Sequence, residues 1–288
     1  MSVSTELSKR MKEYYEFIPK TKLMRRCPVC IRIDGKAFHT FTRGFQKPFD
    51  EILIQTMQET MKYLCENIQG CVFGYTQSDE ITLILIDYQK LNSNAFFDYE
   101  VQKLCSISAS MATMAFNKFF HNNVSEWCSG NKLSFMSWMN DDKDPELVKM
   151  FHIYWDAVHK GAMFDARCFN IPKEEVANLL YWRQDDASRN SIQMVGQANF
   201  SHKELQHKSN SQIQDMLMLE KGINWNDFPT HQKRGSCCIK EFYQDENVDI
   251  KDGPCLRSRW IIDKEIPIFK GEDRNYIERF IYVGEGGN

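Results

Sequence analysis

Long apolar segments are absent from this sequence of 288 residues. Its apolar runs are short and interrupted, as between Ile81 and Ile86, whereas a membrane-spanning helix needs about 20 predominantly apolar residues. The first residues, from Met1 to Leu7, also lack the apolar region of a secretory signal. We therefore expect a cytoplasmic protein that makes no contact with a membrane.

A large excess of positive charge is absent as well. The chain has 36 Lys and Arg residues against 39 Asp and Glu residues, a formal net charge of −3, which excludes a protein that coats nucleic acid non-specifically. The charge is nevertheless uneven, because residues 1–26 contain seven basic and three acidic side chains. This N-terminal basic arm either contacts phosphates or forms a solvated helix face with a few ion pairs.

A second pair of cysteines at C-x2-C spacing is absent, although the chain has ten cysteines. A zinc ribbon needs two pairs at ligand spacing. Cys27 and Cys30 form one, whereas Cys237, Cys238 and Cys255 are adjacent or far apart. A chain of this length buries a sizeable core without disulfides. We therefore expect reduced thiols, many of them in the core, with a zinc site or a redox pair at Cys27 and Cys30 as the alternatives.

Internal repeats and low-complexity linkers are also absent, so the elements are read from local patterns. Apolar runs and their spacing predict strands at 29–33, 71–76, 81–86 and 164–171, a hairpin at 77–80, a helix that begins after Asp50, and a helix at about 99–120. This β-α-β-β-α-β order predicts an α+β fold of the ferredoxin-like split type, with a long insertion before the last strand.

The remaining residues contain two helical patterns and short strand-like runs at 236–242 and 260–262. We expect a catalytic domain with its basic arm over residues 1–172 and an appended C-terminal lobe over residues 173–288.

Two carboxylates end neighbouring parts of this pattern. Asp34 follows the first strand and Asp79 lies in the hairpin, 45 residues later in the sequence, and the expected topology brings them together. Mg²⁺ binds through one or two carboxylates together with substrate phosphates, and two such ions stabilise the attacking and leaving oxygens of a phosphoryl transfer. Gly35 lets the backbone approach closely, so its carbonyl is a further candidate ligand.

Basic residues follow the first carboxylate, and Lys36, His39 and Lys47 are candidate donors to a triphosphate. Each motif by itself is more typical of an ordinary turn, and Lys47 is alternatively a solvent-facing loop residue. Their occurrence together in one β-α-β-β unit favours a site for metal and nucleotide.

Five segments, in order, resemble the tRNA-His guanylyltransferase family, whose members add nucleotides in the 3′-to-5′ direction at tRNA 5′ ends. They are R-I-D-G-K-A-F-H (32–39), K-P-F-D (47–50), G-Y-T-Q-S-D-E (74–80), F-D-A-R-C-F-N-I-P (164–172) and W-R-Q-D-D (182–186), within a match over roughly residues 5–240. The resemblance implies a nucleotidyltransferase with a polymerase palm-like domain, ATP and GTP as substrates, tRNA as partner, and a homotetramer.

The resemblance also implies roles for particular residues. Asp34 and Asp79 would be catalytic and, with the backbone of Gly35, would hold two Mg²⁺ ions; the role of Glu80 stays open. The implied nucleotide-binding residues are Asp34, Gly35, Lys36, Ala37, Phe38, His39, Lys47, Asp50, Ser78 and Asp79. Phe49 stands where the family has Asn, which leaves no amide contact at that position.

A larger departure follows W-R-Q-D-D. Members that add the extra guanosine to histidine tRNA carry H-I-N-N-L-Y-N there, whereas this chain has Ser-Arg-Asn-Ser-Ile-Gln at 188–193. The chain therefore resembles the guanylyltransferase-like group, which repairs 5′-truncated tRNA by copying the opposite strand. The expected tRNA-binding residues are Arg183, Ser188, Asn190, Lys203, Lys208, Lys233 and Arg234.

Three alternatives stay open at this point. They are a strict guanylyltransferase for histidine tRNA, a nucleotide cyclase-like palm enzyme that uses no polynucleotide, and a non-catalytic zinc or RNA-binding module organised around Cys27 and Cys30.

Overall fold

The computed structural model describes residues 3–133, 144–245 and 255–283. Its centre is a six-stranded sheet with the order β4-β1-β3-β2-β5-β6, in which all neighbouring strands run antiparallel. The strands are β1 (Val29–Gly35), β2 (Cys71–Gln77), β3 (Glu80–Leu85), β4 (Phe164–Asn170), β5 (Ser236–Asp245) and β6 (Cys255–Asp263). The antiparallel sheet and its flanking helices agree with the predicted α+β class.

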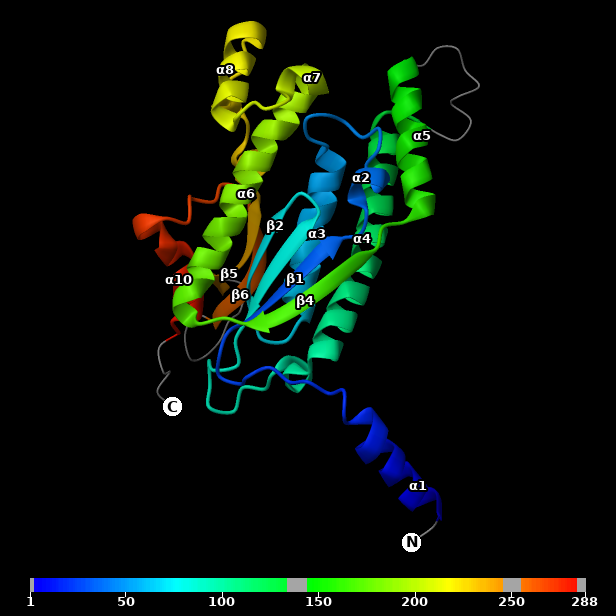
Figure 1. Cartoon of the computed structure of the whole chain (residues 1–288), viewed down its shortest axis with the longest axis vertical. Helices are drawn as coiled ribbons and strands as arrows, with labels where there is room; N and C mark the ends of the chain where they lie inside the picture. The colour runs from blue at the N-terminus through cyan, green and yellow to red at the C-terminus, as the bar shows by residue number, and fades with distance from the viewer. Residues whose placement is uncertain (1–2, 134–143, 246–254, 284–288) are drawn as a thin grey trace.

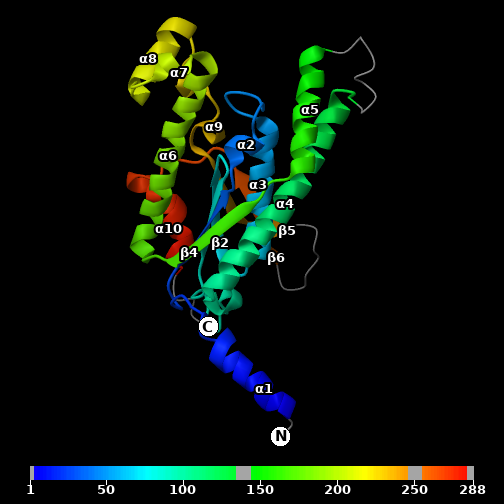
Figure 2. The same ribbon diagram turned by 45° about the vertical axis from the view of Figure 1, so that its right-hand side comes forward.

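Helices cover both faces of this sheet (Figures 1 and 2). The longer helices are α3 (Glu51–Asn67), α4 (Val101–Gly130), α5 (Pro145–Lys160), α6 (Lys173–Asn199) and α8 (Asn210–Lys221). The shorter helices and turns are α1 (Val3–Met11), η1 (Lys12–Glu16), α2 (Phe38–Phe41), η2 (Phe96–Tyr99), α7 (His202–Leu205), η4 (Trp225–Asp227), α9 (Thr230–Arg234), η5 (Gly271–Arg274) and α10 (Asn275–Ile281).

The side chains of β1 alternate between two cores, because successive residues of a strand point to opposite faces. Val29, Ile31 and Ile33 belong to the core beneath α3 and α4, whereas Cys30 belongs to the core beneath α6 and α10. The same alternation places Arg32 and Asp34 on the α6 face of the sheet. The Asp34 carboxylate is therefore accessible from that face.

The helix predicted to follow Asp50 begins where the sequence predicts it. The Asp50 carboxylate accepts a hydrogen bond from the backbone N–H of Leu53 at 2.9 Å and caps α3. The helix predicted at 99–120 continues to Gly130. Val124 and Cys128 continue its buried apolar face at a spacing of four residues. The helix is therefore about ten residues longer than predicted.

The last two strands extend the same sheet. β5 pairs with β2 and β6 pairs with β5, while the end of α6 packs against α8 in a small separate core that includes Val195, Ile213 and Leu217. The proposed division at residue 172 stays a prediction.

The N-terminal arm extends away from the sheet in both ribbon views. Two of its basic residues form internal ion pairs, since Arg25 contacts the buried Asp87 and Lys22 contacts Asp98. Nine of the ten cysteines, those whose side chains the structure describes, are free thiols. Within the described ranges, no helix combines the length and the apolar character needed to cross a membrane.

Candidate active site

The two predicted carboxylates lie side by side at one end of the sheet. Asp34 is paired with Glu80 across β1 and β3, and the backbone N–H of Gly35 donates to the carbonyl oxygen of Asp79 at 3.1 Å. The expected convergence of these two segments is therefore confirmed. The turn is tighter than predicted, because Gln77 already pairs with Glu80 and only Ser78 and Asp79 remain in it.

Both carboxylates lie in a negative environment. Burial raises the pKa of Asp79, and the charges of Asp34 and Glu80 raise it further, although hydrogen bonds from its own backbone and from Ser78 oppose the shift. Burial likewise raises the pKa of Asp34, with added repulsion from Glu80 and Asp165. Two ionised carboxylates held together in this way attract a cation.

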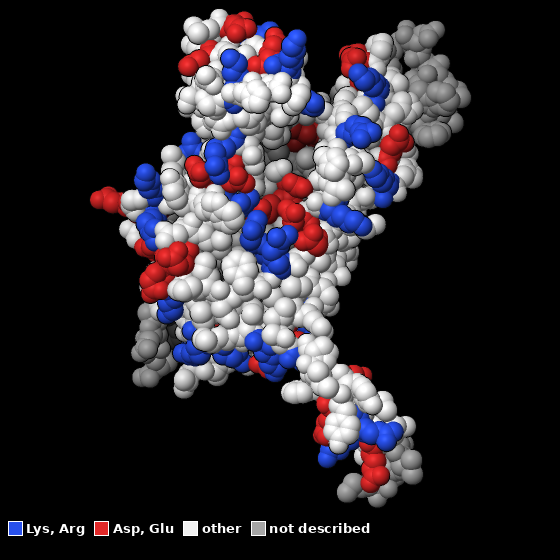
Figure 3. All heavy atoms as spheres, in the orientation of Figure 1, with Lys and Arg blue, Asp and Glu red and all other residues white. Residues whose placement is uncertain are grey.

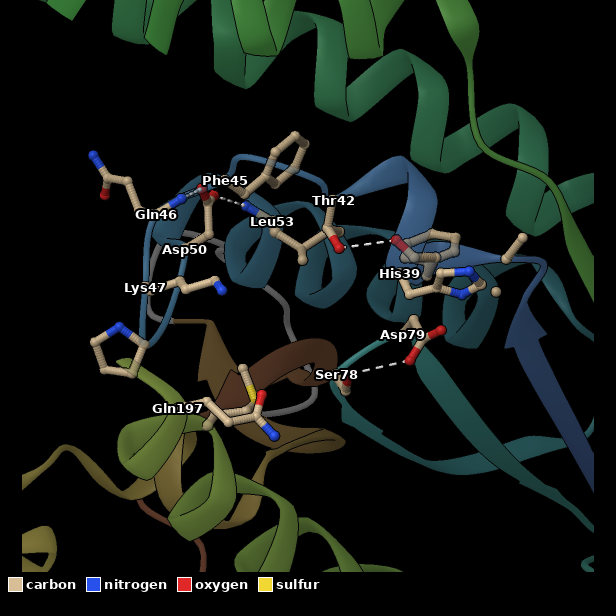
Figure 4. A pocket seen from close by; sticks show the side chains of 15 residues that line it. His39, Thr42, Phe45, Gln46, Lys47, Asp50, Leu53, Ser78, Asp79 and Gln197 are labelled. Atoms are coloured by element: carbon tan, nitrogen blue, oxygen red, sulfur yellow. Dashed lines mark hydrogen bonds between the residues drawn. The ribbon is translucent and has the colours of Figure 1, made fainter. Parts of the chain in front are cut away.

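A pocket of about 490 Å³ opens beside the β2–β3 turn. It is lined by Gly35, Ala37, Phe38, His39, Thr42, Phe45, Gln46, Lys47, Pro48, Asp50, Leu53, Ser78, Asp79, Met194 and Gln197. Figure 4 shows Asp79, Ser78 and His39 on one side and Lys47 and Gln197 across from them. Eight of the ten predicted nucleotide-binding residues thus line one cavity; Asp34 and Lys36 do not.

Strand alternation explains the position of Asp34. Gly35 lies on the pocket side of β1, so the preceding residue points to the α6 face, next to the pocket rather than in its wall. Lys36 is exposed and its backbone N–H bonds to the carbonyl oxygen of Met163 at 2.8 Å.

The residue at position 35 has to be glycine because Phe38 packs directly against it. A Cβ atom at Gly35 would lie 2.2 Å from Cδ2 of Phe38. That ring is itself fixed, with centroid distances of 5.5 Å to Phe116 and 5.2 Å to Phe164. The intervening Ala37 has φ of 55°, a left-handed conformation that a non-glycine residue adopts at an energetic cost.

Asp50 shapes the opposite wall of the pocket. Its carboxylate accepts hydrogen bonds from the backbone N–H of Gln46 at 3.0 Å and from the Tyr154 hydroxyl at 2.7 Å, in addition to the helix cap. The buried carboxylate therefore has structural partners on both oxygens, and it holds the loop that carries Lys47.

Sequence reasoning missed the wall that α6 contributes. Met194 and Gln197 line the main pocket, and Asn190 and Met194 line a smaller neighbouring pocket that also contains His231. Asn190, Met194 and Gln197 recur at a spacing of four and three residues, so they share one helix face. That spacing was visible in the sequence, but the position at which α6 crosses the site was not.

Glu80 is held by two arginines. Arg183 donates to both carboxylate oxygens at 2.9 Å, and Arg32 donates to the same oxygens at 3.2 and 2.7 Å. Glu80 is only 6% exposed, so the arginines supply the hydrogen bonds that a buried carboxylate needs. Arg183, a predicted tRNA-binding residue, is itself buried, and its guanidinium also contacts Asp186 at 2.9 Å.

The other predicted tRNA-binding residues are spread over the C-terminal part of the chain. Asn190, Lys203 and Lys208 are exposed. The Ser188 hydroxyl donates to the carbonyl oxygen of Gln184 at 3.0 Å. Their contact with tRNA stays a prediction.

Two basic residues at the end of α9 also have internal partners. The Lys233 ammonium donates to the carbonyl oxygen of Asn226 at 2.5 Å and lies 5.8 Å from the centroid of Trp225. The carbonyl of Arg234 accepts a hydrogen bond from the Tyr75 hydroxyl at 2.7 Å. These contacts fix the backbone between α9 and β5.

The donor set at the sheet end fits a hard divalent cation. Two carboxylates and a backbone carbonyl offer oxygen ligands only, which Mg²⁺ prefers. No group of three or more His, Cys, Asp or Glu side chains that could hold a metal occurs within residues 3–133, 144–245 and 255–283. The Cys27 thiol instead donates to the carbonyl oxygen of Ile171 at 3.4 Å, and Cys30 is fully buried.

Comparisons with known proteins show which chains are similar to this one. Residues 8–172 match the family described as tRNAHis guanylyltransferase. A bacterial tRNA(His) guanylyltransferase-like protein in complex with ATP is 43% identical, with a TM-score of 0.74 over 96% of this chain and 100% of that chain. Its counterpart in complex with GTP is 39% identical, with a TM-score of 0.72 over 96% and 99%. The tRNA(His) guanylyltransferase of Saccharomyces cerevisiae is 26% identical over 76% of this chain and 85% of that protein.

Proposed function

This chain belongs to the tRNAHis guanylyltransferase family and is a nucleotidyltransferase, and we propose that it extends tRNA 5′ ends in the 3′-to-5′ direction by copying the opposite strand. One observation carries the proposal: the hydrogen bond from Gly35 to Asp79 holds both carboxylate-bearing segments at the edge of a pocket of about 490 Å³. The bacterial proteins in complex with ATP and with GTP support nucleoside triphosphates as the ligands of this pocket.

We propose that Asp34, Asp79 and the carbonyl of Gly35 hold two Mg²⁺ ions. The donors are all oxygens. Burial, and after it the repulsion between neighbouring carboxylates, raises the pKa of each aspartate, and a bound cation would favour the ionised form of both. When bound, the ions neutralise phosphate charge and lower the pKa of the attacking 3′-hydroxyl.

The protein's own residues orient the incoming nucleotide. Lys47 and His39 are positioned to donate to phosphate oxygens, and Ser78 closes the site from the hairpin. Gln197 lies across the pocket from Asp79 (Figure 4), and Met194 lines the same pocket. An amide and an apolar surface suit a base. The sheet then serves as a palm-like platform, and catalysis rests on positioning and charge rather than on a covalent nucleophile.

The choice of template-dependent repair rests on α6. This helix lacks the H-I-N-N-L-Y-N block of the strict guanylyltransferases. In the segment at the same place in the chain, the Asn190 side chain is exposed, and the Ser188 hydroxyl donates a hydrogen bond within the helix. We propose a homotetramer, because several subunits that share one tRNA would supply cations that no single segment of this acidic chain provides. We also propose that the protein acts in the cytoplasm.

The decisive experiment offers two RNAs side by side with ATP and GTP. We expect extension of a 5′-truncated non-histidine tRNA, with added bases complementary to the opposite strand. Addition of guanosine only to full-length histidine tRNA, whatever the opposite base, would instead establish the strict guanylyltransferase. A gel-shift titration addresses the cyclase-like alternative, which requires no binding of tRNA.

A further inference from the structure

A half-exposed tryptophan lies on α6 near the carboxylates. Trp182 is 50% exposed, although a side chain of this size is usually well buried. The guanidinium carbons of Arg183 and Arg32 lie 4.6 and 5.5 Å from its ring centroid. Both arginines are fixed by Glu80 and are largely buried, so they cover the inner part of the ring while the outer part faces solvent.

The tryptophan borders the catalytic end of the sheet. Arg32 precedes Asp34 by two residues on the same face of β1, about 6.6 Å along the strand. On β4, Arg167 lies opposite Arg32 and Asp165 lies opposite Asp34. Figure 3 shows acidic and basic side chains gathered on this face, below the hollow between α6 and α5. Trp182 therefore lies beside an open, charged surface that leads to the carboxylates.

The nucleotide pocket lies farther along the same helix. Met194, which lines that pocket, follows Trp182 by twelve residues on α6, about 18 Å along the helix axis. Trp182 does not line the pocket. A reaction that joins two substrates needs a second binding surface on the other side of its catalytic carboxylates, and the face around Trp182 has that position.

We propose that Trp182 is a stacking platform for a base of the tRNA acceptor end next to the reacting 5′ phosphate. The inference rests on the proposed function and adds the surface that holds the polynucleotide. Exposed aromatic rings bind unpaired or terminal nucleobases by stacking. Arg167, whose side chain is 58% exposed, is the neighbouring cation for a backbone phosphate. The Glu80 clamp keeps the ring in place before tRNA binds.

The test compares three replacements of Trp182 in the full-length protein. Trp182→Phe keeps an aromatic ring, Trp182→Leu keeps only an apolar side chain, and Trp182→Ala removes both. Loss of one stacked base weakens binding roughly 5- to 150-fold. We expect this increase in the Kd and KM for tRNA in the Leu and Ala variants, little change in the Phe variant, and KM values for ATP and GTP within about twofold of the wild type.

A fluorescent base reports the contact directly. We expect the wild type and Trp182→Phe, but not Trp182→Leu, to quench 2-aminopurine placed at the 5′-terminal position of the tRNA. The matched control is Phe242→Ala, which removes another exposed ring, 63% exposed on β5, and should leave tRNA binding unchanged.

Three results would overturn the stacking role: equal tRNA affinity in the Phe and Leu variants, quenching retained in Trp182→Leu, or an equal rise in the KM for the triphosphate. A wild-type protein that binds no tRNA would refute the proposed function itself. Unaltered tRNA binding by Trp182→Leu would refute only the platform.

Discussion

The two-arginine clamp on Glu80 makes a quantitative prediction for Arg183→Met. The replacement keeps an apolar chain of similar length but removes two hydrogen bonds of 2.9 Å to a carboxylate that is 6% exposed. Breaking a buried ion pair costs about 3 to 5 kcal/mol. Arg32 remains as a partner of Glu80, so we expect a loss near the lower end, about 3 kcal/mol. For a chain of this size that loss lowers Tm by roughly 6 to 12 °C.

Arg189→Met is the matched control, because Arg189 lies on the same helix and also pairs with Asp186. Its side chain is 54% exposed, and exposed ion pairs contribute at most about 1 kcal/mol. The assay is urea unfolding of both variants, followed by circular dichroism. We expect the midpoint of Arg183→Met to fall well below that of Arg189→Met.

A double-mutant cycle with Glu80→Gln isolates the pair itself. If the guanidinium acts through Glu80, Arg183→Met costs much less once the carboxylate is gone, and the coupling energy is at least about 1.5 kcal/mol. A coupling below about 0.5 kcal/mol, or equal losses in the two arginine variants, would refute the reasoning. It would mean that Arg183 stabilises α6 by packing rather than by charge.

Three further predictions concern the catalytic carboxylates and their support. Asp34→Ala or Asp79→Ala should abolish nucleotide addition while Tm is kept or raised, because burial and neighbouring carboxylates disfavour the ionised form of each aspartate. Asp165→Asn is the control that should retain activity. Turnover by either Ala variant would contradict the assignment. Gly35→Ala should abolish addition and lower Tm, since its Cβ would displace Phe38; unchanged values of both would disprove the close approach. The raised pKa of both aspartates means that their contribution to stability is present below the ordinary carboxyl pKa and is lost as pH rises through the raised value. Activity runs the opposite way, rising with pH as the carboxylates ionise, and its midpoint should move to lower pH at higher Mg²⁺ concentration; a midpoint independent of Mg²⁺ would contradict cation binding by these groups.

The sheet could be predicted from sequence because its inner strands are short, mostly apolar runs that end at chemically distinct turns. The strand before Asp34 and the hairpin around Asp79 needed no information beyond local pattern, and the α3 cap at Asp50 followed from the residue type. The far wall of the pocket could not be predicted, because Gln197 reaches it only through the crossing of α6 over the sheet. The sequence also does not show which residues of β1 point to which face of the sheet. The position of Asp34 outside the pocket wall therefore could not be predicted.

Arginine burial limited the sequence reasoning in a different way. Arg183 is among the residues that the sequence predicts to bind tRNA, yet its side chain is buried and pairs with a carboxylate 103 residues away in sequence. Arg25 likewise contacts the buried Asp87. Because these cations are already engaged inside the chain, counting basic residues overestimates the charge available to a polynucleotide. On the proposed function, recognition of tRNA would then depend on exposed cations such as Lys203 and Arg167, the latter paired with the exposed Asp165 at 3.5 Å. It would also depend on contacts that carry no charge, among which we propose the exposed ring of Trp182 next to the carboxylates.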